Sequence, residues 1–281
     1  MSGSASDRQR PPDGHASAHR RIVSAGIMLG ILIALAAIGP LLYQADPNQL
    51  DLSRAGELPG ADHPLGTDEA GRDVLGRLLA GGRVSLAVGF AAVACSALLG
   101  LTLGALAALA GRRADALIMR ATDAMLAIPA LFLIIAALAF FGTSLAGLIL
   151  AIGGTSWMGL SRLVRGELLA IREQPFVEAA RALGARPWRV FGRHALPHLL
   201  PSVSVNLTFG VGTAILMESA LSFLGLGIQP PAASWGNMLT NAQSYLYSTP
   251  WLAVYPGLLI LVTVVSVNVL GDALRDATEP H

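Results

Sequence analysis

Carboxylate and amide side chains are rare inside the long apolar segments of this sequence. The main ones are Asp123, Asn206, Glu218, Asn268 and Asp272. An ionisable side chain is costly to bury at membrane depth, so each carboxylate is a candidate for proton or ion coupling. Asp123 follows Arg120 by three residues, and an ion pair within one helix is the simpler explanation there. Glu218 either faces a water-filled path or bonds to a neighbouring helix.

Two histidines are the strongest candidates for metal ligands. His194 and His198 stand four residues apart, which could place both imidazoles on one helical face. Pro197 lies between them and no third ligand is nearby, so histidines at an interface are the better interpretation. The sequence contains no G-x-S-x-G, H-E-x-x-H or Walker A pattern. It therefore predicts no catalytic site, metal site or bound cofactor, and any energy source lies in another chain or in an ion gradient.

The composition is that of an integral membrane protein. Of 281 residues, 53% are hydrophobic and only 13% are charged. All 19 basic residues are arginine, and the formal net charge of +1 gives no reason to expect nucleic-acid binding. The single cysteine, Cys95, lies in an apolar run and is expected to be a small buried hydrophobe.

Six apolar segments are each long enough to cross the membrane as a helix. They are Ile22–Leu42, Val84–Ala110, Ala116–Phe141, Leu145–Val164, Leu199–Phe223 and Trp251–Leu270. The expected organisation is a disordered tail (1–21), a first span (22–42), a loop (43–83), a five-helix core (84–276) and a short tail (277–281). The fold class is all-α with six transmembrane helices.

The distribution of arginine orients these spans. If the N-terminus is cytoplasmic, the inner segments hold 15 of the 19 arginines, and the outer segments hold only Arg54, Arg72, Arg77 and Arg83. The first outer loop also carries seven acidic residues, and the loop near 225–250 carries no charge. Both termini, and the segment between the fourth and fifth spans, are therefore expected on the cytoplasmic side.

That cytoplasmic segment contains a short amphipathic helix. Pro175 can start it, Gly184 can stop it, and an apolar stripe follows 3/4 spacing. The stripe consists of Phe176, Ala179, Ala180 and Leu183. A helix this short is marginal alone, so its stripe either docks into a groove on another protein or rests on lipid headgroups.

Small residues recur in the spans. Gly100 and Gly104 form a G-x-x-x-G, and Gly153, Gly154 and Gly159 recur in the fourth span. Such faces allow helices to approach closely. They serve either packing within one bundle or association with a second membrane subunit.

The amphipathic segment resembles the EAA loop of permease subunits of bacterial ABC importers. The matching residues are Glu178, Ala179 and Ala180, then Gly184, then Leu196 and Pro197. His194 departs from the family pattern, which prefers isoleucine at that position. The resemblance implies that the loop over 172–198 holds the coupling helix, with Phe176 and Leu183 among the residues that meet an ATPase.

A second set of motifs resembles the C-type permeases for dipeptides and oligopeptides, over about 63–276. These motifs are His63–Asp68, Gly71–Leu75, Arg83–Leu86, Met119 to Pro129, Arg162–Gly166, Leu221–Gly227, Pro230–Gly236 and Asn268–Asp276. The bland interpretation of the first is loop architecture, in which Pro64 and Gly66 shape a turn and the charged residues pair internally.

The resemblance implies a type I (MetI-like) importer permease in the bacterial inner membrane, without catalysis of its own. The implied partners are a homologous B-type permease, two cytoplasmic ATPase subunits that bind ATP and Mg²⁺, an extracytoplasmic binding protein and membrane lipid. The segments Asp62–Arg83 and Gly225–Tyr247 would face the binding protein. The expected cargo is short peptides, with nickel, metallophore complexes or glutathione as alternatives. An ion-coupled secondary transporter, with Asp123 and Glu218 as coupling sites, is the alternative from another class.

Overall fold

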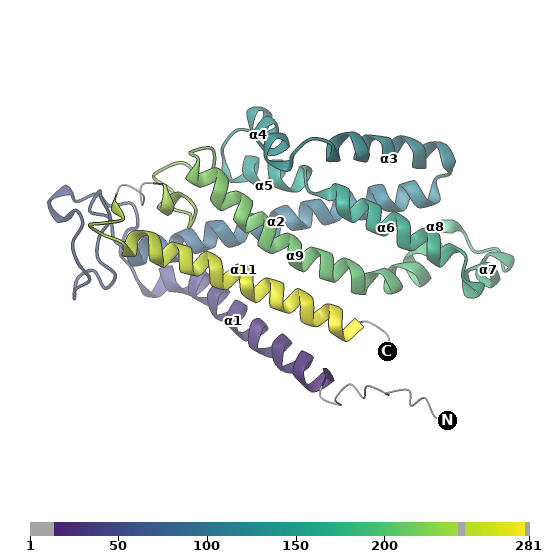
Figure 1. The fold of residues 1–281 in the computed structure, drawn as a ribbon, viewed down its shortest axis with the longest axis horizontal. Coiled ribbons are helices and arrows are strands. Elements are labelled where there is room, and N and C mark those ends of the chain that lie inside the picture. The colour runs from purple at the N-terminus through teal and green to yellow at the C-terminus, as the bar shows by residue number, and fades with distance from the viewer. Residues whose placement is uncertain (1–13, 241–244, 279–281) are drawn as a thin grey trace, which may run out of the picture.

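A long central helix, α2 (Val74–Leu109), organises the computed structural model, which describes residues 14–240 and 245–278. Helices α1, α5, α6 and α9 all pack against α2, and α11 packs against α1 and α9 (Figure 1). The other helices are α1 (Gly14–Leu42), α3 (Arg112–Leu126), α4 (Ala130–Phe141), α5 (Leu145–Gly154), α6 (Trp157–Arg172), α7 (Pro175–Ala182), α8 (Pro187–Val190), α9 (Leu196–Phe223) and α11 (Trp251–Thr278). A π-helical turn covers Phe191–Ala195, and short 3₁₀ turns cover Leu52–Arg54 and Asn237–Leu239.

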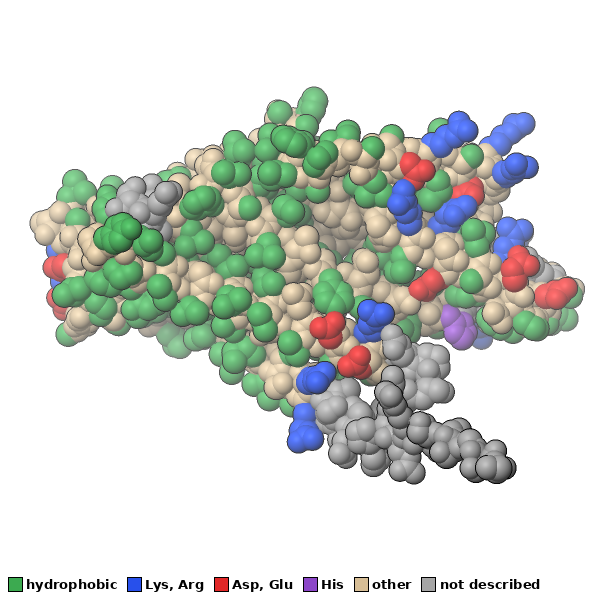
Figure 2. Space-filling view, in the orientation of Figure 1, with side chains coloured by type: hydrophobic (Ala, Val, Ile, Leu, Met, Phe, Trp, Pro, Cys, Tyr) green, Lys and Arg blue, Asp and Glu red, His purple; other side chains and the backbone are tan. Residues whose placement is uncertain are grey.

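The described part of the chain is an elongated helical bundle with two distinct ends. The start of α1, the end of α11 and helix α7 lie toward one end, which we call the α7 end (Figure 1). The segments 43–73 and 224–250 lie at the opposite end, which we call the loop end. Apolar side chains cover the length between them, and blue arginine side chains gather toward the α7 end in Figure 2.

Within the described residues, five continuous segments are long and apolar enough to cross a membrane, and a bent pair of helices makes a sixth if it counts as one span. The pair is α3 and α4, which meet at an angle of 100°. The helix expected over Ala116–Phe141 is therefore not continuous, although the bent pair remains a candidate sixth span. Pro129 explains the break, because proline lacks a backbone donor and disfavours helical geometry at Ile128 before it.

Two boundaries expected from hydropathy also move. Helix α1 begins at Gly14, so residues 14–21 are helical where a disordered tail was expected, and residues 1–13 lie outside the described chain. The alanines and arginines of this stretch are good helix formers and extend the apolar span. Helix α2 begins at Val74, where a loop to residue 83 was expected, because the Asp73 carboxylate caps it by accepting from the Gly76 N–H at 2.6 Å.

Glycines bring α2 close to α6. A Cβ built on Gly100 would lie 2.8 Å from the Leu160 side chain, and one on Gly104 would lie 2.6 Å from the Ser161 carbonyl oxygen. The G-x-x-x-G pattern therefore serves packing within this chain. Gly153 packs in the same way against α2, with Ala92 and Cys95 as neighbours, whereas Gly154 and Gly159 face open space.

Arg83 of α2 forms hydrogen bonds with the backbone of α1 near the loop end, at a point where Pro40 interrupts the helical bonding of α1. Pro40 has no N–H, so it cannot complete the helical hydrogen bond to the Ala36 carbonyl. The guanidinium of Arg83 donates instead, from Nε to Ala36 O at 2.8 Å and from Nη2 to Ala37 O at 2.6 Å. A free carbonyl within a span is costly, so this contact satisfies both the backbone and the charged side chain.

We expect Arg83→Ala to lower the free energy of unfolding by about 1.5–3 kcal/mol, the usual contribution of a charge-assisted hydrogen bond. In a Pro40→Ala background the new N–H at position 40 would satisfy Ala36 O, so the same change should cost less. Thermal unfolding of the four variants in detergent gives the coupling energy as a double-mutant cycle. If Arg83→Ala lowers the free energy of unfolding equally in both backgrounds, the proposed role of Arg83 in satisfying the Ala36 carbonyl is contradicted.

Candidate functional site

Helix α7 is the centre of the predicted coupling loop. One of its faces packs against the bundle, and the other is largely exposed to solvent. Val177 is buried, and Ala180 is partly buried. Phe176 is 41% exposed and Leu183 is 89% exposed, and Ala179 between them is also exposed. The exposed apolar part of the predicted stripe is therefore centred on Ala179 and Leu183.

The end of α7 has the geometry that its sequence predicts. Gly184 adopts a φ of +82°, a left-handed conformation that side chains with a Cβ rarely take. The Ala185 N–H donates to the Ala180 carbonyl at 3.0 Å, which is the six-residue bond of a Schellman motif with Gly184 at the C′ position. This turn directs the chain away from α7 directly after Leu183.

The two halves of the predicted EAA loop lie on different helices. Glu178 is exposed in the first turn of α7, where an acidic side chain suits the helix dipole. Leu196 and Pro197 form the first turn of α9, where the missing proline N–H is not needed. A ring contact between Phe176 and His198, with centroids 5.5 Å apart, connects α7 to α9.

Asp123 does not pair with Arg120, as its spacing had suggested. Its carboxylate contacts the guanidinium of Arg162 on α6, and both side chains are largely exposed. A second pair of the same kind joins Asp115 on α3 to Arg165 on α6, through two parallel hydrogen bonds. These pairs hold α3 against α6, so the geometry gives Asp123 a positioning role.

Glu218 is fully buried and bonds to the neighbouring helix, one of the two roles expected for it. Its carboxylate accepts from Ser85 Oγ on α2 at 3.0 Å and from Ser222 Oγ on α9 at 2.8 Å. Ser85 Oγ also accepts from the Trp235 N–H at 3.1 Å, and Ser222 Oγ accepts from the Ile228 N–H at 3.2 Å. Glu218 thus joins α2, α9 and the loop that follows α9.

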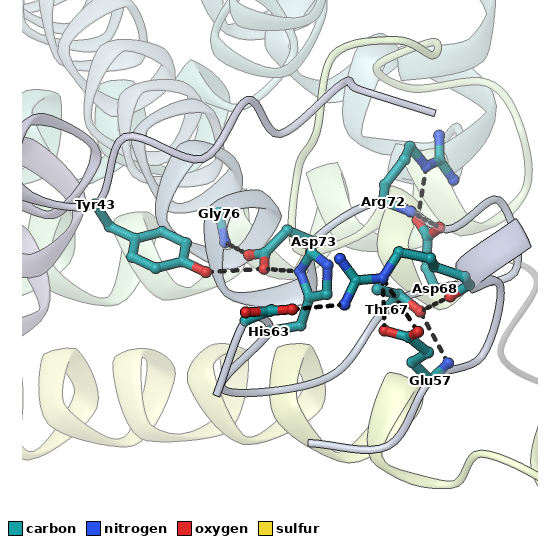
Figure 3. A network of polar contacts seen from close by, with 10 residues as sticks. Tyr43, Glu57, His63, Thr67, Asp68, Arg72, Asp73 and Gly76 are labelled. Carbon is teal, nitrogen blue, oxygen red and sulfur yellow. Dashed lines mark hydrogen bonds and ion pairs between the residues drawn. The ribbon is translucent and has the colours of Figure 1, made fainter. Parts of the chain in front are cut away.

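The loop between α1 and α2 is fixed by two buried aspartates (Figure 3). Asp73 accepts from the Tyr43 hydroxyl at 2.8 Å, and its Oδ2 lies 2.7 Å from His63 Nδ1. Burial and the hydrogen bond to Asp73 raise the pKa of Tyr43 to about 12, so its hydroxyl stays protonated and donates even at alkaline pH. The Asp73 carboxylate therefore ties the end of α1 to the start of α2.

The other aspartate, Asp68, organises the turn itself. It accepts from the backbone N–H groups of Ala70 and Arg72, both at 2.9 Å, and pairs with Arg72 Nε at 2.6 Å. Gly66 takes a φ of +77° close to the Glu57 carbonyl. The charged motif at 63–73 is thus loop architecture in this structure, with Asp73 paired to Tyr43 and His63 while Arg72 pairs with Asp68.

Among the residues that the structure describes, no group of three or more His, Cys, Asp or Glu residues has the arrangement of a metal site. The His194 side chain lies outside that description, and His198 contacts Phe176. Sequence reasoning missed Val177, the buried anchor of α7. The available signal was its spacing of three residues from Ala180, which places both side chains on one face of the helix.

The family model and the similar proteins all point to the same family of transport proteins. The model of the family "binding-protein-dependent transport system inner membrane component" matches residues 100–281. A glutathione transport system permease protein of Pectobacterium atrosepticum is 40% identical, over 92% of this chain and 86% of its own. A dipeptide transport system permease protein of Alkalihalophilus pseudofirmus is 41% identical, over 90% and 84%, and a probable D,D-dipeptide permease of Escherichia coli is 39% identical, over 92% and 87%.

A solved structure shows the same fold. One chain of the inward-facing MetNI methionine ABC transporter aligns with a TM-score of 0.60 and 19% identity, over 71% of this chain and 95% of its own. The helical bundle therefore has the MetI-like fold. The chain belongs to the family of binding-protein-dependent transport system inner membrane components, the permease subunits of ABC transporters.

Proposed function

We propose that this permease subunit imports short peptides delivered by an extracytoplasmic binding protein. The names of its relatives support this cargo, since they include a dipeptide, a probable D,D-dipeptide and a glutathione permease. Glutathione is itself a tripeptide, so it falls within the same chemical class and is the specific alternative. The subunit carries no catalysis of its own in this proposal, and ATP hydrolysis occurs in partner subunits.

The observation that carries the coupling role is the exposed apolar surface at the end of α7, mainly Ala179 and Leu183. Val177 holds the helix to the bundle while Phe176 and Leu183 stay exposed, although large apolar side chains normally seek burial. We assign this stripe (Phe176, Ala179, Ala180 and Leu183), with Glu178 beside it, to contact with a cytoplasmic ATPase. Gly184 stops the helix, and Leu196 and Pro197 start the span that carries the movement into the membrane.

Arginine placement supports the orientation. The start of α3 and the end of α6, which carry Arg112, Arg113 and Arg172, lie toward the α7 end (Figure 1), and Figure 2 shows blue side chains gathered there. Cytoplasmic loops carry an excess of arginine, so the α7 end and both termini face the cytoplasm of a bacterial inner membrane in our proposal. The loop end then faces the binding protein.

The proposed complex contains this subunit, a homologous second permease, two ATPase subunits and a binding protein. Driven closure of the ATPases would move α7, and rigid-body rotation of the bundles would open the path to one side at a time. The contact between Phe176 and His198 supplies a direct link from α7 to α9 for such movement.

The function is tested by reconstituting the whole complex in proteoliposomes. We expect radiolabelled di- or tripeptide to accumulate only with both ATP and loaded binding protein present. Ligands extracted from the purified binding protein and identified by mass spectrometry then define the cargo. Accumulation driven by an ion gradient without ATP would contradict the importer and favour an ion-coupled carrier.

A further inference from the structure

A groove with a mixed polar and apolar lining opens on the flank of the bundle at the middle of α9. It has a volume of about 250 Å³ and lies between α2, the junction of α5 and α6, and α9. Its polar lining comes from Ser96, Ser156, Asn206 and Thr213, and its apolar lining includes Phe209 and Met217. Figure 2 shows no red or blue side chain over the middle of this face of the molecule, where α5 and α9 lie.

Asn206 is the least satisfied of these polar side chains. Its carboxamide is exposed and makes no hydrogen bond with any residue that the structure describes. Thr213 and Ser156 differ, because their hydroxyls donate to the carbonyls of Phe209 at 3.1 Å and Ile152 at 2.6 Å. They therefore offer mainly acceptor oxygens to the groove, while Asn206 offers both donors and an acceptor.

The depth of Asn206 requires a polar surrounding. It is the eleventh residue of α9, about 15 Å along a helix that spans the membrane. An unpaired carboxamide facing hydrocarbon at that depth is costly, so polar residues in spans face a bundle interior or a hydrated path. The described residues supply no such partner, and the groove must be filled by something outside this chain.

The groove matches a peptide backbone in its chemistry. A peptide group carries one donor and one acceptor, as does the carboxamide of Asn206, so the two can pair reciprocally. The lining has no formal charge and therefore favours neither acidic nor basic side chains. Contacts of this kind recognise the part that all peptides share.

We propose that this groove binds the backbone of the peptide cargo during translocation, with Asn206 pairing to a peptide group and Ser96, Ser156 and Thr213 lining its path. The proposal rests on the proposed peptide import. Because the groove lining carries no formal charge, we expect the permease to accept peptides of either sign.

The test replaces Asn206 with its charged isostere in the complete transporter. In proteoliposomes with saturating binding protein, uptake of Ala-Ala, Ala-Lys and Ala-Glu is measured per complex. We expect Asn206→Asp to change the Ala-Lys to Ala-Glu uptake ratio at least threefold in favour of Ala-Lys. Asn206→Leu should lower all three rates at least threefold without changing the ratio. The matched control is Thr208→Val, two residues along α9, whose hydroxyl bonds only the Ser204 carbonyl; it should leave all rates unchanged.

Two results would overturn the inference. One is an assembled Asn206→Asp complex with the ratio of the wild type. The other is loss of the second permease from purified Asn206 variants, which would make Asn206 a contact between subunits. If the wild-type complex accumulates none of the three peptides, the proposed peptide import fails, and this outcome is distinct from both.

Discussion

Gly184→Val should reduce ATP-driven uptake at least tenfold while the protein still inserts and assembles. Gly184 needs a φ of +82°, and the left-handed conformation costs about 1–2 kcal/mol for a residue with a Cβ, more for a β-branched one. No neighbouring atom lies within 4 Å of a Cβ at this position, so the change disturbs the turn and not the packing. About 1.4 kcal/mol is a tenfold change in a docking equilibrium. The expected defect is therefore in contact with the ATPase.

Gly111 provides the matched control for this prediction. It also has a positive φ, of +95°, and open space around it, and it lies in the turn between α2 and α3. Gly111→Val introduces at least as much backbone strain outside α7, because a φ of +95° with a ψ of 172° is a conformation essentially limited to glycine. It should leave the ratio of uptake to ATP hydrolysis unchanged. The measurement is uptake and ATPase activity on the same proteoliposomes. If both variants lose uptake equally, Gly184 contributes only to the general stability of the fold and has no specific role in coupling.

Residues that start and stop a helix explain why the bounds of α7 could be predicted so closely. Pro175 and Gly184 act through their own backbone conformations, and these depend little on the rest of the fold. The structure places the helix at Pro175–Ala182 and the positive φ at Gly184, as the sequence predicts. The role of the stripe in docking stays a prediction, since it concerns a partner outside the chain.

Hydropathy located the spans but not their breaks. The mean hydropathy over 18 or more residues changes little with the single Pro129. That proline nevertheless ends the continuous helix, and the axes of α3 and α4 meet at 100°. The start of α2 shifted for a related reason, because one capping carboxylate, Asp73, decides where the helix begins. Both boundary errors arose because a hydropathy average does not include the backbone effect of a single proline or the capping effect of a single aspartate.

Contacts between distant helices could not be derived from spacing. Arg162 lies 39 residues from Asp123, and Ser85 lies 133 residues from Glu218. Arg120 is the nearest basic residue to Asp123 in sequence, yet the fold brings α6 to α3 and supplies another partner. Polar residues in spans thus indicate that a contact exists, while only the tertiary arrangement identifies the partner.

Glu218→Ala should lower the stability of the bundle by roughly 2–4 kcal/mol, from lost charge-assisted hydrogen bonds and a cavity. The carboxylate is 0% exposed and accepts from the hydroxyls of Ser85 and Ser222. Through those serines it also holds the Trp235 backbone to α2 and the Ile228 backbone to α9. We expect a lower midpoint of thermal unfolding in detergent and easier proteolysis of the loop after α9.

Two further variants separate this structural role from ion coupling. Ser161→Ala removes another buried hydroxyl, one without a partner among the described residues, and should leave the midpoint unchanged or raise it. Glu218→Gln keeps the shape and one acceptor oxygen, and the serine hydroxyls can rotate to meet its amide. It should be more stable than Glu218→Ala and should retain ATP-driven uptake. A Glu218→Gln protein of normal stability without transport would instead make this carboxylate a proton or ion site, because only the titratable group has been lost.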